Sequence, residues 1–325
     1  MNKILITGCA GFIGFHYCLK LLNEGYFVVG LDNLNNYYDI NLKLSRLKIL
    51  EESEKKENFK FIKADIVEID NLKVIFKEEK PEIVVNFAAQ AGVRYSITNP
   101  EDYAKTNLLG FFNILECSKN NDIKNLIYAS SSSVYGGNKI LPFSEEDKVD
   151  KPISFYAATK KANELMAESY NSLYGFSCIG LRFFTVYGEW GRPDMAPMIF
   201  ANAIKNNQTL KIFNHGKCFR DFTYIDDVIE SIFKLMEKIY DSNDNSHHIF
   251  NVGNSKKIEL MKFINYLEDA FKKKARKKFL PLQQGDVEST FSDCTKLEKF
   301  INYKPNTNLK KGIRNFSKWY LEYQN

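Results

Sequence analysis

The sequence predicts an α/β protein built on a Rossmann-type, doubly wound parallel sheet, with a smaller C-terminal α/β domain for a substrate. Short apolar runs alternate with helix-like segments through the first half of the 325-residue chain. Glycines follow the first of these runs, and the regular alternation stops after Phe184. Strands that alternate with helices favour right-handed crossovers and therefore a parallel sheet.

Five apolar runs are the predicted strands of the first half. Each is continuously apolar rather than alternating, which is typical of strands covered by helices on both faces. Residues 33–58 form a longer connection in which we expect a helix around Ile40 to Glu54. The predicted strands are Ile4 to Thr7, Phe27 to Leu31, Phe59 to Ile62, Ile83 to Phe87 and Leu126 to Ala129.

The second half of the chain is expected to cross a domain border more than once. Gly and Pro gather at Gly188 to Pro193, which favours loops. The predicted elements are strands at Leu210 to Phe213, Phe219 to Tyr224 and His248 to Val252, and helices at Ile225 to Tyr240, Ile258 to Phe271 and Leu309 to Tyr323. We predict a Rossmann domain of residues 1–183 that residues 225–252 rejoin, and a second domain of residues 184–224 and 253–325.

Composition and charge narrow the class of protein. Hydrophobic residues make up 44% and charged residues 26% of the chain, close to the average for a soluble globular enzyme. The formal charge of +5 comes from scattered lysines and a denser run at Lys272 to Lys278, which we interpret as solvated surface. No basic arm is interleaved with aromatic residues, so nucleic acid is not an expected partner.

Cysteines, histidines and apolar runs favour a cytoplasmic protein without a metal or a membrane span. The six cysteines show no C-x-x-C spacing, Met1 is followed by no secretory leader, and no apolar run approaches the roughly 20 residues that a membrane helix needs. The four histidines fall in no metal-ligand spacing. They are His16, His215, His247 and His248.

The glycine loop predicts a dinucleotide site. Gly8, Gly11 and Gly14 follow the first strand and open a helix, where backbone N–H groups and the helix dipole attract a pyrophosphate. Asp32 ends the second strand, where a carboxylate accepts hydrogen bonds from a ribose diol. Because Asn33 follows and no Arg or Lys occupies the next few positions, NAD is favoured over NADP. The alternatives are a plain turn and an aspartate that caps it.

A tyrosine and a lysine stand four positions apart at Tyr156 and Lys160, in a segment of strong helix character, so both side chains lie on one helix face. Lowering a tyrosine pKa by about 3 units requires about 4 kcal/mol of preferential stabilisation of the phenolate, which a lysine and a positive nicotinamide can supply together. Four serines precede them at Ser130 to Ser133, at the end of a predicted strand. A polar loop and an ordinary solvated helix are the alternatives.

Five motifs in order resemble the extended short-chain dehydrogenase/reductases, and within them the nucleotide-sugar 4-epimerases. The resemblance covers nearly the whole chain. The motifs are Thr7-Gly-Cys-Ala-Gly-Phe-Ile-Gly14, Ala129 to Gly136, Tyr156-Ala-Ala-Thr-Lys160, Leu181-Arg-Phe-Phe-Thr-Val-Tyr-Gly188 and Arg220-Asp-Phe-Thr-Tyr-Ile-Asp-Asp227.

This resemblance implies roles for individual residues. Ser131, three positions before the Val of Val-Tyr-Gly, would hydrogen-bond the reacting sugar oxygen, with Tyr156 and Lys160 as its catalytic partners. The implied NAD contacts come from the glycine loop, the ends of the strands and the catalytic helix. They are Gly8, Gly11, Phe12, Ile13, Gly14, Asp32, Asn33, Asp65, Ile66, Ala88, Ala89, Asn107, Tyr156, Lys160 and Phe183.

The positions after Ser131 discriminate between reactions. The 4,6-dehydratases of the family carry Asp-Glu there and decarboxylases a Glu, because elimination or enolisation needs an acid or base. Here they are Ser132 and Ser133, so neither reaction has its carboxyl group. Three segments are similar to UDP-glucuronate 4-epimerases: Gly188 to Ala196, Asp32 to Tyr38 and Val93 to Ser96.

The similarity to UDP-glucuronate 4-epimerases implies which residues hold the sugar nucleotide. Arg192, Thr185, Ser132 and Ser133 would hold the C6 carboxylate, and Arg220 would clamp the diphosphate, as planar guanidinium donors suit both anions. For Arg192 a surface ion pair or a second phosphate contact is the alternative. The implied substrate residues are Arg94, Ser132, Ser133, Thr185, Arg192, Phe213 and Arg220.

The function expected from the resemblance is interconversion of UDP-glucuronate and UDP-galacturonate through a 4-keto sugar, with NAD retained. A second reading is 4-epimerisation of a neutral UDP-hexose or UDP-N-acetylhexosamine. A third is a non-catalytic NAD-sensing module, because a fold alone does not fix function. The family further implies a homodimer, packed through the helix after Pro100 and the Tyr156 helix, and a place in the synthesis of surface polysaccharide.

Overall fold

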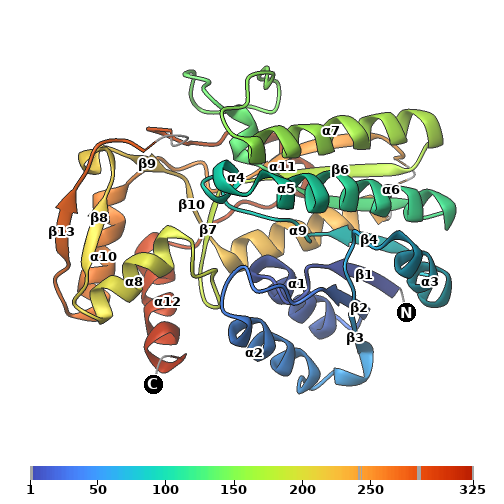
Figure 1. Cartoon of the computed structure of the whole chain (residues 1–325), viewed down its shortest axis with the longest axis horizontal. Helices are drawn as coiled ribbons and strands as arrows, with labels where there is room; N and C mark the ends of the chain where they lie inside the picture. Colours follow the sequence, from blue (N-terminus) through green and yellow to red (C-terminus); the bar gives the residue numbers. More distant parts are fainter. Residues whose placement is uncertain (1–2, 241, 243, 284–286, 324–325) are drawn as a thin grey trace.

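The computed structural model describes residues 3–240, 242, 244–283 and 287–323. Its centre is a seven-stranded parallel sheet in the order β11-β6-β5-β4-β1-β2-β3 (Figure 1). The strands are β1 (Lys3–Thr7), β2 (Phe27–Asp32), β3 (Phe59–Lys63), β4 (Ile83–Asn86), β5 (Asn125–Ser131), β6 (Ser177–Phe183) and β11 (His247–Val252). The predicted Rossmann-type sheet is therefore confirmed.

Helices cover both faces of the sheet, which explains the continuous apolarity of the strands (Figure 1). On β1, Ile4 and Ile6 belong to the core on one face, and Leu5 belongs to the core on the other. The first face carries α1 (Phe12–Asn23), α2 (Ile40–Glu51) and α9 (Ile225–Tyr240). The second carries α3 (Ile69–Glu79), α6 (Phe111–Asn120) and α7 (Phe155–Tyr174), with the π-helical η2 (Ala104–Gly110) and α5 (Pro100–Tyr103) leading into α6.

Strand β6 was not among the predicted strands, although all seven of its residues are buried. Gly180 and Arg182 interrupt its apolar pattern. A β-carbon at Gly180 would lie 2.6 Å from the hydroxyl of Tyr128, so the glycine makes room for a side chain of the neighbouring strand. Arg182 is buried because Glu164 of α7 pairs with it at 2.8 Å. Both departures from the pattern reflect contacts with residues distant in the sequence.

The smaller domain lies at one end of the sheet and contains three two-stranded ladders (Figure 1). These pair β7 (Thr185–Tyr187) with β10 (Phe222–Tyr224), β9 (Phe219–Arg220) with β12 (Ile258–Glu259), and β8 (Thr209–Ile212) with β13 (Arg276–Phe279). Its helices are α8 (Ala196–Lys205), α10 (Leu260–Phe271) and α12 (Leu309–Tyr323), and α11 (Thr295–Ile301) packs on α9 and β11. The predicted strand at 219–224 is two strands, interrupted at Asp221, whose carboxylate accepts the backbone N–H groups of Asn254, Ser255 and Ser292.

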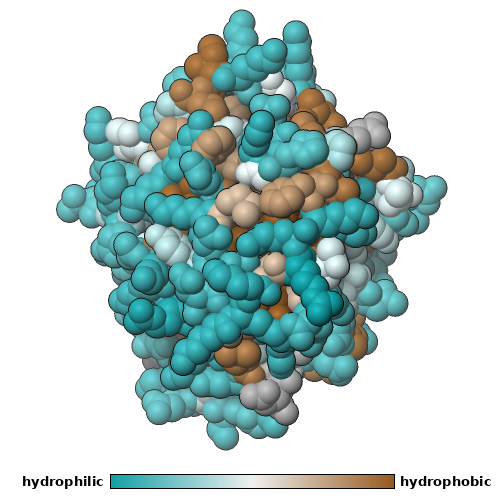
Figure 2. Space-filling model, turned by 90° about the vertical axis from the view of Figure 1, so that its left-hand side faces the viewer, coloured by the Kyte–Doolittle hydropathy of each residue, from teal (hydrophilic) through white to brown (hydrophobic). Residues whose placement is uncertain are grey.

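The lysine run at Lys272 to Lys278 lies at the surface of this domain, as predicted. This face of the molecule is largely hydrophilic, with hydrophobic residues near the top, in a band across the middle and in a few places near the bottom (Figure 2). Lys274 and Lys277 both pair with the buried Glu268, at 3.0 and 2.5 Å. Among the described residues, no helix is long and apolar enough to cross a bilayer.

The long connection after β2, residues 33–58, contacts two loops through the buried side chain of Arg46. Arg46 of α2 is fully buried. It donates to the carbonyl of Ala10 in the glycine loop at 2.7 Å and to the carbonyl of Trp190 at 2.6 Å. Because a buried guanidinium needs several acceptors, these carbonyls fix the two loops relative to each other. The glycine loop and the segment that carries Arg192 are therefore parts of one structural unit.

Candidate active site

One cavity of about 1240 Å³ lies at the carboxyl ends of β1, β2, β4, β5 and β6 and extends into the smaller domain. Parallel sheets place ligands at this edge, where the loops that follow the strands converge. Every residue that the sequence assigned to catalysis, cofactor or substrate lines this cavity, except Asn107. The structure therefore brings together side chains that are far apart along the chain, such as Asp32 and Arg220, which are 188 positions apart.

The glycine loop closes one end of the cavity. Gly8 has φ +74°, a left-handed conformation that favours glycine, and a β-carbon there would lie 2.8 Å from the backbone nitrogen of Ala88. A β-carbon at Gly14 would collide with the carbonyl of Gly8, so the first turn of α1 lies directly on the loop. This tight turn leaves the backbone open to a pyrophosphate, and the residues present fit a dinucleotide.

Asp32 lies beside this loop at the end of β2. Its carboxylate accepts the N–H groups of Ala10, at 3.2 Å, and Leu34, at 2.9 Å, and leaves further lone pairs toward the cavity. Asn33 donates to Asp65 at 2.9 Å, so these two predicted cofactor residues are in contact. The ammonium of Lys43, in α2, lies 3.9 Å from the carboxylate of Asp32. Lys43 is eleven positions further along the chain, so the residues next to Asp32 in the sequence do not reveal this contact.

Asn107 lies behind the cavity wall rather than in it. Its side chain accepts from the N–H of Gln90 at 2.8 Å and donates to the carbonyl of the same residue at 3.0 Å. It also donates to Thr159 of α7 at 3.1 Å. Asn107 thus holds the segment after β4, which lines the cavity, against the catalytic helix, and a direct contact with cofactor stays a prediction.

Helix α7 presents Tyr156 and Lys160 to the cavity on one face. Ser154 caps its N-terminus by accepting the N–H of Ala157 at 3.1 Å. Lys160 is buried and donates to the carbonyl of Ala129 at 2.8 Å. Burial lowers the pKa of Lys160 from 10.5 to about 7. The lysine is therefore poised to change its charge near neutral pH.

The pKa of Tyr156 is raised above its ordinary value of 10, because burial disfavours the phenolate. A hydrogen bond with Ser131 and the positive charge of Arg192 act in the opposite direction, while Asp194 raises the pKa further. Ser131 ends β5 and accepts the N–H of Ser133 at 3.1 Å, which starts η3 (Ser132–Tyr135). The groups that favour the phenolate here are thus Ser131 and Arg192, and a bound positive nicotinamide would add to them.

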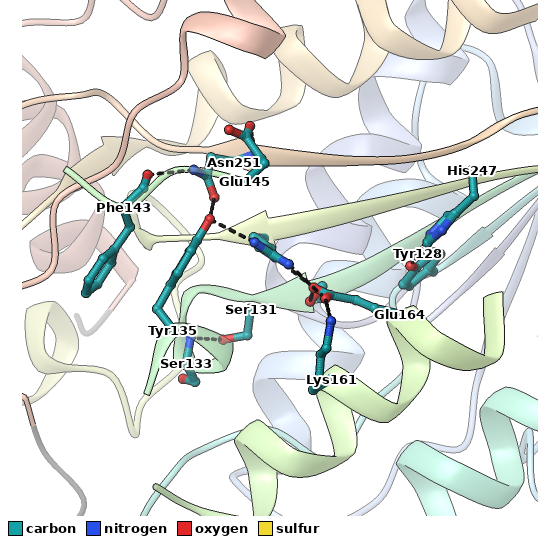
Figure 3. A network of polar contacts seen from close by, with 12 residues as sticks. Tyr128, Ser131, Ser133, Tyr135, Phe143, Glu145, Lys161, Glu164, His247 and Asn251 are labelled. Carbon is teal, nitrogen blue, oxygen red and sulfur yellow. Dashed lines mark hydrogen bonds and ion pairs between the residues drawn. The ribbon is translucent and has the colours of Figure 1, made fainter. Parts of the chain in front are cut away.

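A buried polar network fixes α7 behind the catalytic residues (Figure 3). Glu164, one turn after Lys160, accepts two hydrogen bonds from Arg182 of β6, at 2.8 and 2.9 Å, and one from Ser130 of β5 at 2.7 Å. Arg182 also donates to the hydroxyl of Tyr135 at 3.0 Å, which donates to Asn251 of β11 at 2.6 Å. Although burial raises it, the hydrogen bonds and charge of Arg182 hold the pKa of Glu164 below its usual value.

Arg192 and Thr185 line the cavity, as do Ser132 and Ser133. Arg192 forms a two-point pair with Asp194, from Nε to Oδ1 at 3.0 Å and from Nη2 to Oδ2 at 2.5 Å. The ion pair proposed as an alternative for Arg192 therefore exists, but its guanidinium also faces the cavity. The two readings are compatible because the guanidinium has five N–H donors.

The remaining predicted substrate residues also meet. The guanidinium of Arg94, at the start of α4 (Tyr95–Thr98), lies 5.2 Å from the ring centre of Phe213, just before η4 (Asn214–Gly216). Arg220 donates to the carbonyls of Phe219 and Val287, both at 2.8 Å. These contacts hold both guanidiniums in the wall of the cavity.

The charges of the described cavity wall suit anionic ligands. The described wall contains six basic and three acidic side chains, and none of its residues is a Glu or a His. The basic residues are Lys43, Arg94, Lys160, Arg192, Lys211 and Arg220, and the acidic ones are Asp32, Asp65 and Asp194. No group of three or more His, Cys, Asp or Glu in the described part of the chain is arranged to hold a metal ion.

Some wall residues escaped the sequence analysis. Tyr37 and Asp194 belong to segments that the resemblance had singled out, but neither was assigned a role. Gln90 and Thr290 lie in segments that carry no motif. A search for polar residues next to predicted loops would have found Tyr37 and Asp194; nothing in the local pattern marks Thr290.

Comparisons with known proteins find relatives over nearly the whole chain. The model of the GDP-mannose 4,6-dehydratase family matches residues 5–316. The chain is 49% identical to a protein named CapI of Staphylococcus aureus, covering 99% of each chain. It is 43% identical to a probable UDP-glucuronate 4-epimerase of Rhizobium meliloti, covering 98% of this chain and 96% of the other.

A solved structure has the same fold over its full length. It is the UDP-glucuronic acid 4-epimerase of Bacillus cereus in complex with UDP-glucuronic acid and NAD, with a TM-score of 0.90 and 32% identity over 99% of each chain. The predicted membership of the extended short-chain dehydrogenase/reductases is supported by all of these matches.

The lowered pKa of Lys160 predicts a pH dependence of stability. The unfolded chain holds this proton up to about pH 10.5, whereas the folded protein releases it near pH 7. The buried ammonium therefore destabilises the fold fully below pH 7, and this destabilisation is relieved as the pH rises from 7 to 10.5. We expect the Tm of wild type, relative to Lys160→Met, to rise from pH 7 to pH 10 in calorimetry.

The exposed Lys310 of α12 provides the control for this measurement. The Tm of wild type relative to Lys310→Met should stay constant over the same range. A difference between wild type and Lys160→Met that does not change with pH would contradict a buried, proton-releasing Lys160.

Proposed function

The chain belongs to the extended short-chain dehydrogenase/reductase family, and we propose that it is a UDP-glucuronate 4-epimerase that keeps NAD bound through the cycle. One observation carries the assignment. Arg192, Ser132, Ser133 and Thr185 all line the cavity that holds Tyr156, and the charge of Arg192 acts on the pKa of Tyr156. A guanidinium among hydroxyls is suited to a carboxylate, which neutral UDP-hexoses lack.

NAD is assigned to the Rossmann part of the cavity. The glycine loop would receive the pyrophosphate, and Asp32 would receive the adenosine ribose, where a 2′-phosphate would meet its negative charge. When bound, NAD accepts the C4 hydride of the sugar and returns it. We assign NAD to residues 1–183, with 225–252, and the UDP-sugar chiefly to residues 184–224 and 253–325.

Tyr156 is proposed to move the proton of the C4 hydroxyl. In the first half of the cycle its phenolate takes this proton as the C4 hydride leaves. In the second half, after the 4-keto sugar has turned over, the phenol returns the proton to the C4 oxygen as hydride comes back to the opposite face of C4. Ser131 shares a hydrogen bond with Tyr156 and is proposed to bind the same sugar oxygen. Lys160, held by the carbonyl of Ala129, supplies the positive charge that a phenolate needs.

Arg192 is proposed to control the carboxylate of the intermediate. The 4-keto uronate is a β-keto acid, which loses CO2 when the carboxylate bond stands perpendicular to the ketone plane. Planar donors on Arg192, with Thr185, Ser132 and Ser133, would hold this bond away from that alignment. Arg94, Phe213 and Arg220 are proposed to hold the nucleotide and diphosphate.

The dehydratase chemistry in the name of the matching family model lacks its acid here. Elimination of the C6 hydroxyl needs a carboxyl group near C5 and C6. The cavity wall, in the described residues, carries only Asp32, Asp65 and Asp194, and Asp194 is paired with Arg192. This distribution of carboxylates favours epimerisation over dehydration.

Proton NMR of UDP-glucuronate with the purified protein, without added NAD or reductant, tests the proposal. We expect UDP-galacturonate to appear at a constant total of UDP-sugar, and kcat/KM for UDP-glucuronate to exceed that for UDP-glucose and UDP-N-acetylglucosamine by about 100-fold, as for one charge-assisted contact. Comparable kcat/KM values for the neutral sugars would favour the neutral-sugar epimerase. If none of the three UDP-sugars is converted, the non-catalytic NAD-sensing module becomes the favoured function.

A homodimer and a cytoplasmic location complete the proposal. Exposed apolar side chains on η2, α6 and α7, two of which are Leu109 (46% exposed) and Leu165 (59% exposed), form a surface that a second copy would cover in a four-helix layer. These helices pack side by side (Figure 1).

All six cysteines are buried and unpaired, as in proteins kept in a reducing compartment.

Leu165→Glu tests the dimer. A charge on this apolar surface should convert the protein from two chains to a single 37.7 kDa chain in light scattering. Leu44→Glu, at a residue 45% exposed on α2, is the matched control and should keep two chains. A wild-type protein with the mass of one chain would contradict the dimer.

A further inference from the structure

The pair between Arg192 and Asp194 uses only one side of the guanidinium. Nε and Nη2 of Arg192 meet the two carboxylate oxygens of Asp194, at 3.0 and 2.5 Å. This side-on geometry fixes the plane of the guanidinium and leaves Nη1 unused by Asp194. Although burial raises it, Arg192 holds the pKa of Asp194 below its usual value, so the carboxylate is charged at neutral pH.

Asp194 is itself held from the NAD side of the cavity. The hydroxyl of Tyr37 donates to Oδ2 of Asp194 at 3.2 Å. Gly92 makes room for this contact: a β-carbon there would lie 2.8 Å from the Tyr37 hydroxyl and 3.7 Å from Oδ2 of Asp194. The ring of Tyr37 packs on that of Tyr95, with centres 4.9 Å apart. Tyr37, Gly92 and Asp194 therefore fit together as one contact.

A ladder of side-chain-to-backbone hydrogen bonds connects Tyr37 to Asp32. Asp32 accepts the N–H of Leu34 at 2.9 Å, and Asn33 accepts the N–H of Asn35 at 3.0 Å. Asn35 accepts the N–H of Tyr37 at 3.4 Å and the ammonium of Lys43 at 2.7 Å. Each such bond closes a local turn, so the segment 32–37 is a built structure rather than a loose loop.

We propose that Asp194 and Tyr37 are positioning residues for Arg192, which set the guanidinium so that its free edge receives the C6 carboxylate of the sugar. The inference rests on the proposed uronate epimerase and extends it. Asp194 and the substrate carboxylate occupy different edges of one guanidinium. Tyr37 holds Asp194 at the edge of the guanidinium formed by Nε and Nη2. Tyr37 itself belongs to the segment 32–37, which begins at Asp32, the residue assigned to the NAD ribose.

Positioning and binding are separable in this arrangement. Without the charge of Asp194, the substrate carboxylate becomes the anionic partner of Arg192. Binding of UDP-glucuronate is therefore not weakened. The plane of the guanidinium is then no longer fixed. Turnover should fall, and the carboxylate bond should reach the alignment in which the 4-keto intermediate loses CO2. A lost structural residue would instead weaken binding and cofactor retention together.

The test compares Asp194→Asn and Tyr37→Phe with wild type on UDP-glucuronate. For Asp194→Asn we expect kcat to fall about 10- to 100-fold with KM unchanged or lower, as for loss of a charge-assisted contact, and for Tyr37→Phe about 2- to 10-fold. Mass spectrometry should detect a UDP-pentose species in both. Bound NAD per chain should stay at the wild-type level.

Tyr303→Phe is the matched control, because Tyr303 also donates to an aspartate, Asp227, at 2.9 Å but lies outside the cavity wall. It should keep wild-type kcat and form no pentose. Wild-type kcat and no pentose in both Asp194→Asn and Tyr37→Phe would overturn the proposal, as would a raised KM with unchanged kcat. If Asp194→Asn does not fold, Tyr37→Phe alone decides between these outcomes. A wild-type protein inactive on UDP-glucuronate would instead reject the uronate epimerase itself.

Discussion

The buried pair between Glu164 and Arg182 is the interaction on which the geometry of the site depends. Glu164 lies on the same face of α7 as Tyr156 and Lys160, at successive intervals of four residues, and Arg182 and Ser130 connect it to β6 and β5. These contacts tie the helix that carries Tyr156 to the strand that ends at Ser131 (Figure 3). Breaking one partner of a buried pair is strongly destabilising, which makes the arrangement rigid.

The same network extends to the smaller domain. Tyr135 connects Arg182 to Asn251, which donates to the carbonyls of Phe143 and Asp293 at 2.9 Å. On the other side of the cavity, Arg46 joins the glycine loop to the segment that carries Arg192. Two buried guanidiniums thus hold the walls that NAD and the sugar share, while the reacting groups remain in the cavity between them.

Local spacing was sufficient for the parts of the site that lie within one strand-loop-helix unit. The glycine loop with Asp32, and Tyr156 with Lys160, could be predicted because their geometry follows from a turn and from one helix face. Strand β6 was not predicted because Arg182 interrupts its apolar pattern. Its burial depends on Glu164 of α7, a partner that the sequence of the strand does not reveal. Lys43 and Tyr37 reach the site only through the packing of the excursion 33–58, which no local pattern specifies.

The order of motifs along the chain identified the family, and the structure then corrected the picture of the charges. Arg192 had been considered as either a carboxylate ligand or a member of an ion pair, and its geometry permits both at once. The phenolate of Tyr156 had been expected to be stabilised by Lys160 and a positive nicotinamide, whereas in the structure Ser131 and Arg192 also favour it.

The most direct test of this account follows the hydrogen at C4. UDP-glucuronate labelled with deuterium at C4 should give UDP-galacturonate that keeps the deuterium at C4, without added NAD and without release of label to water. A product with ordinary hydrogen at C4, or conversion that consumes NAD in proportion to product, would contradict a closed cycle in which the hydride leaves and returns to the same carbon.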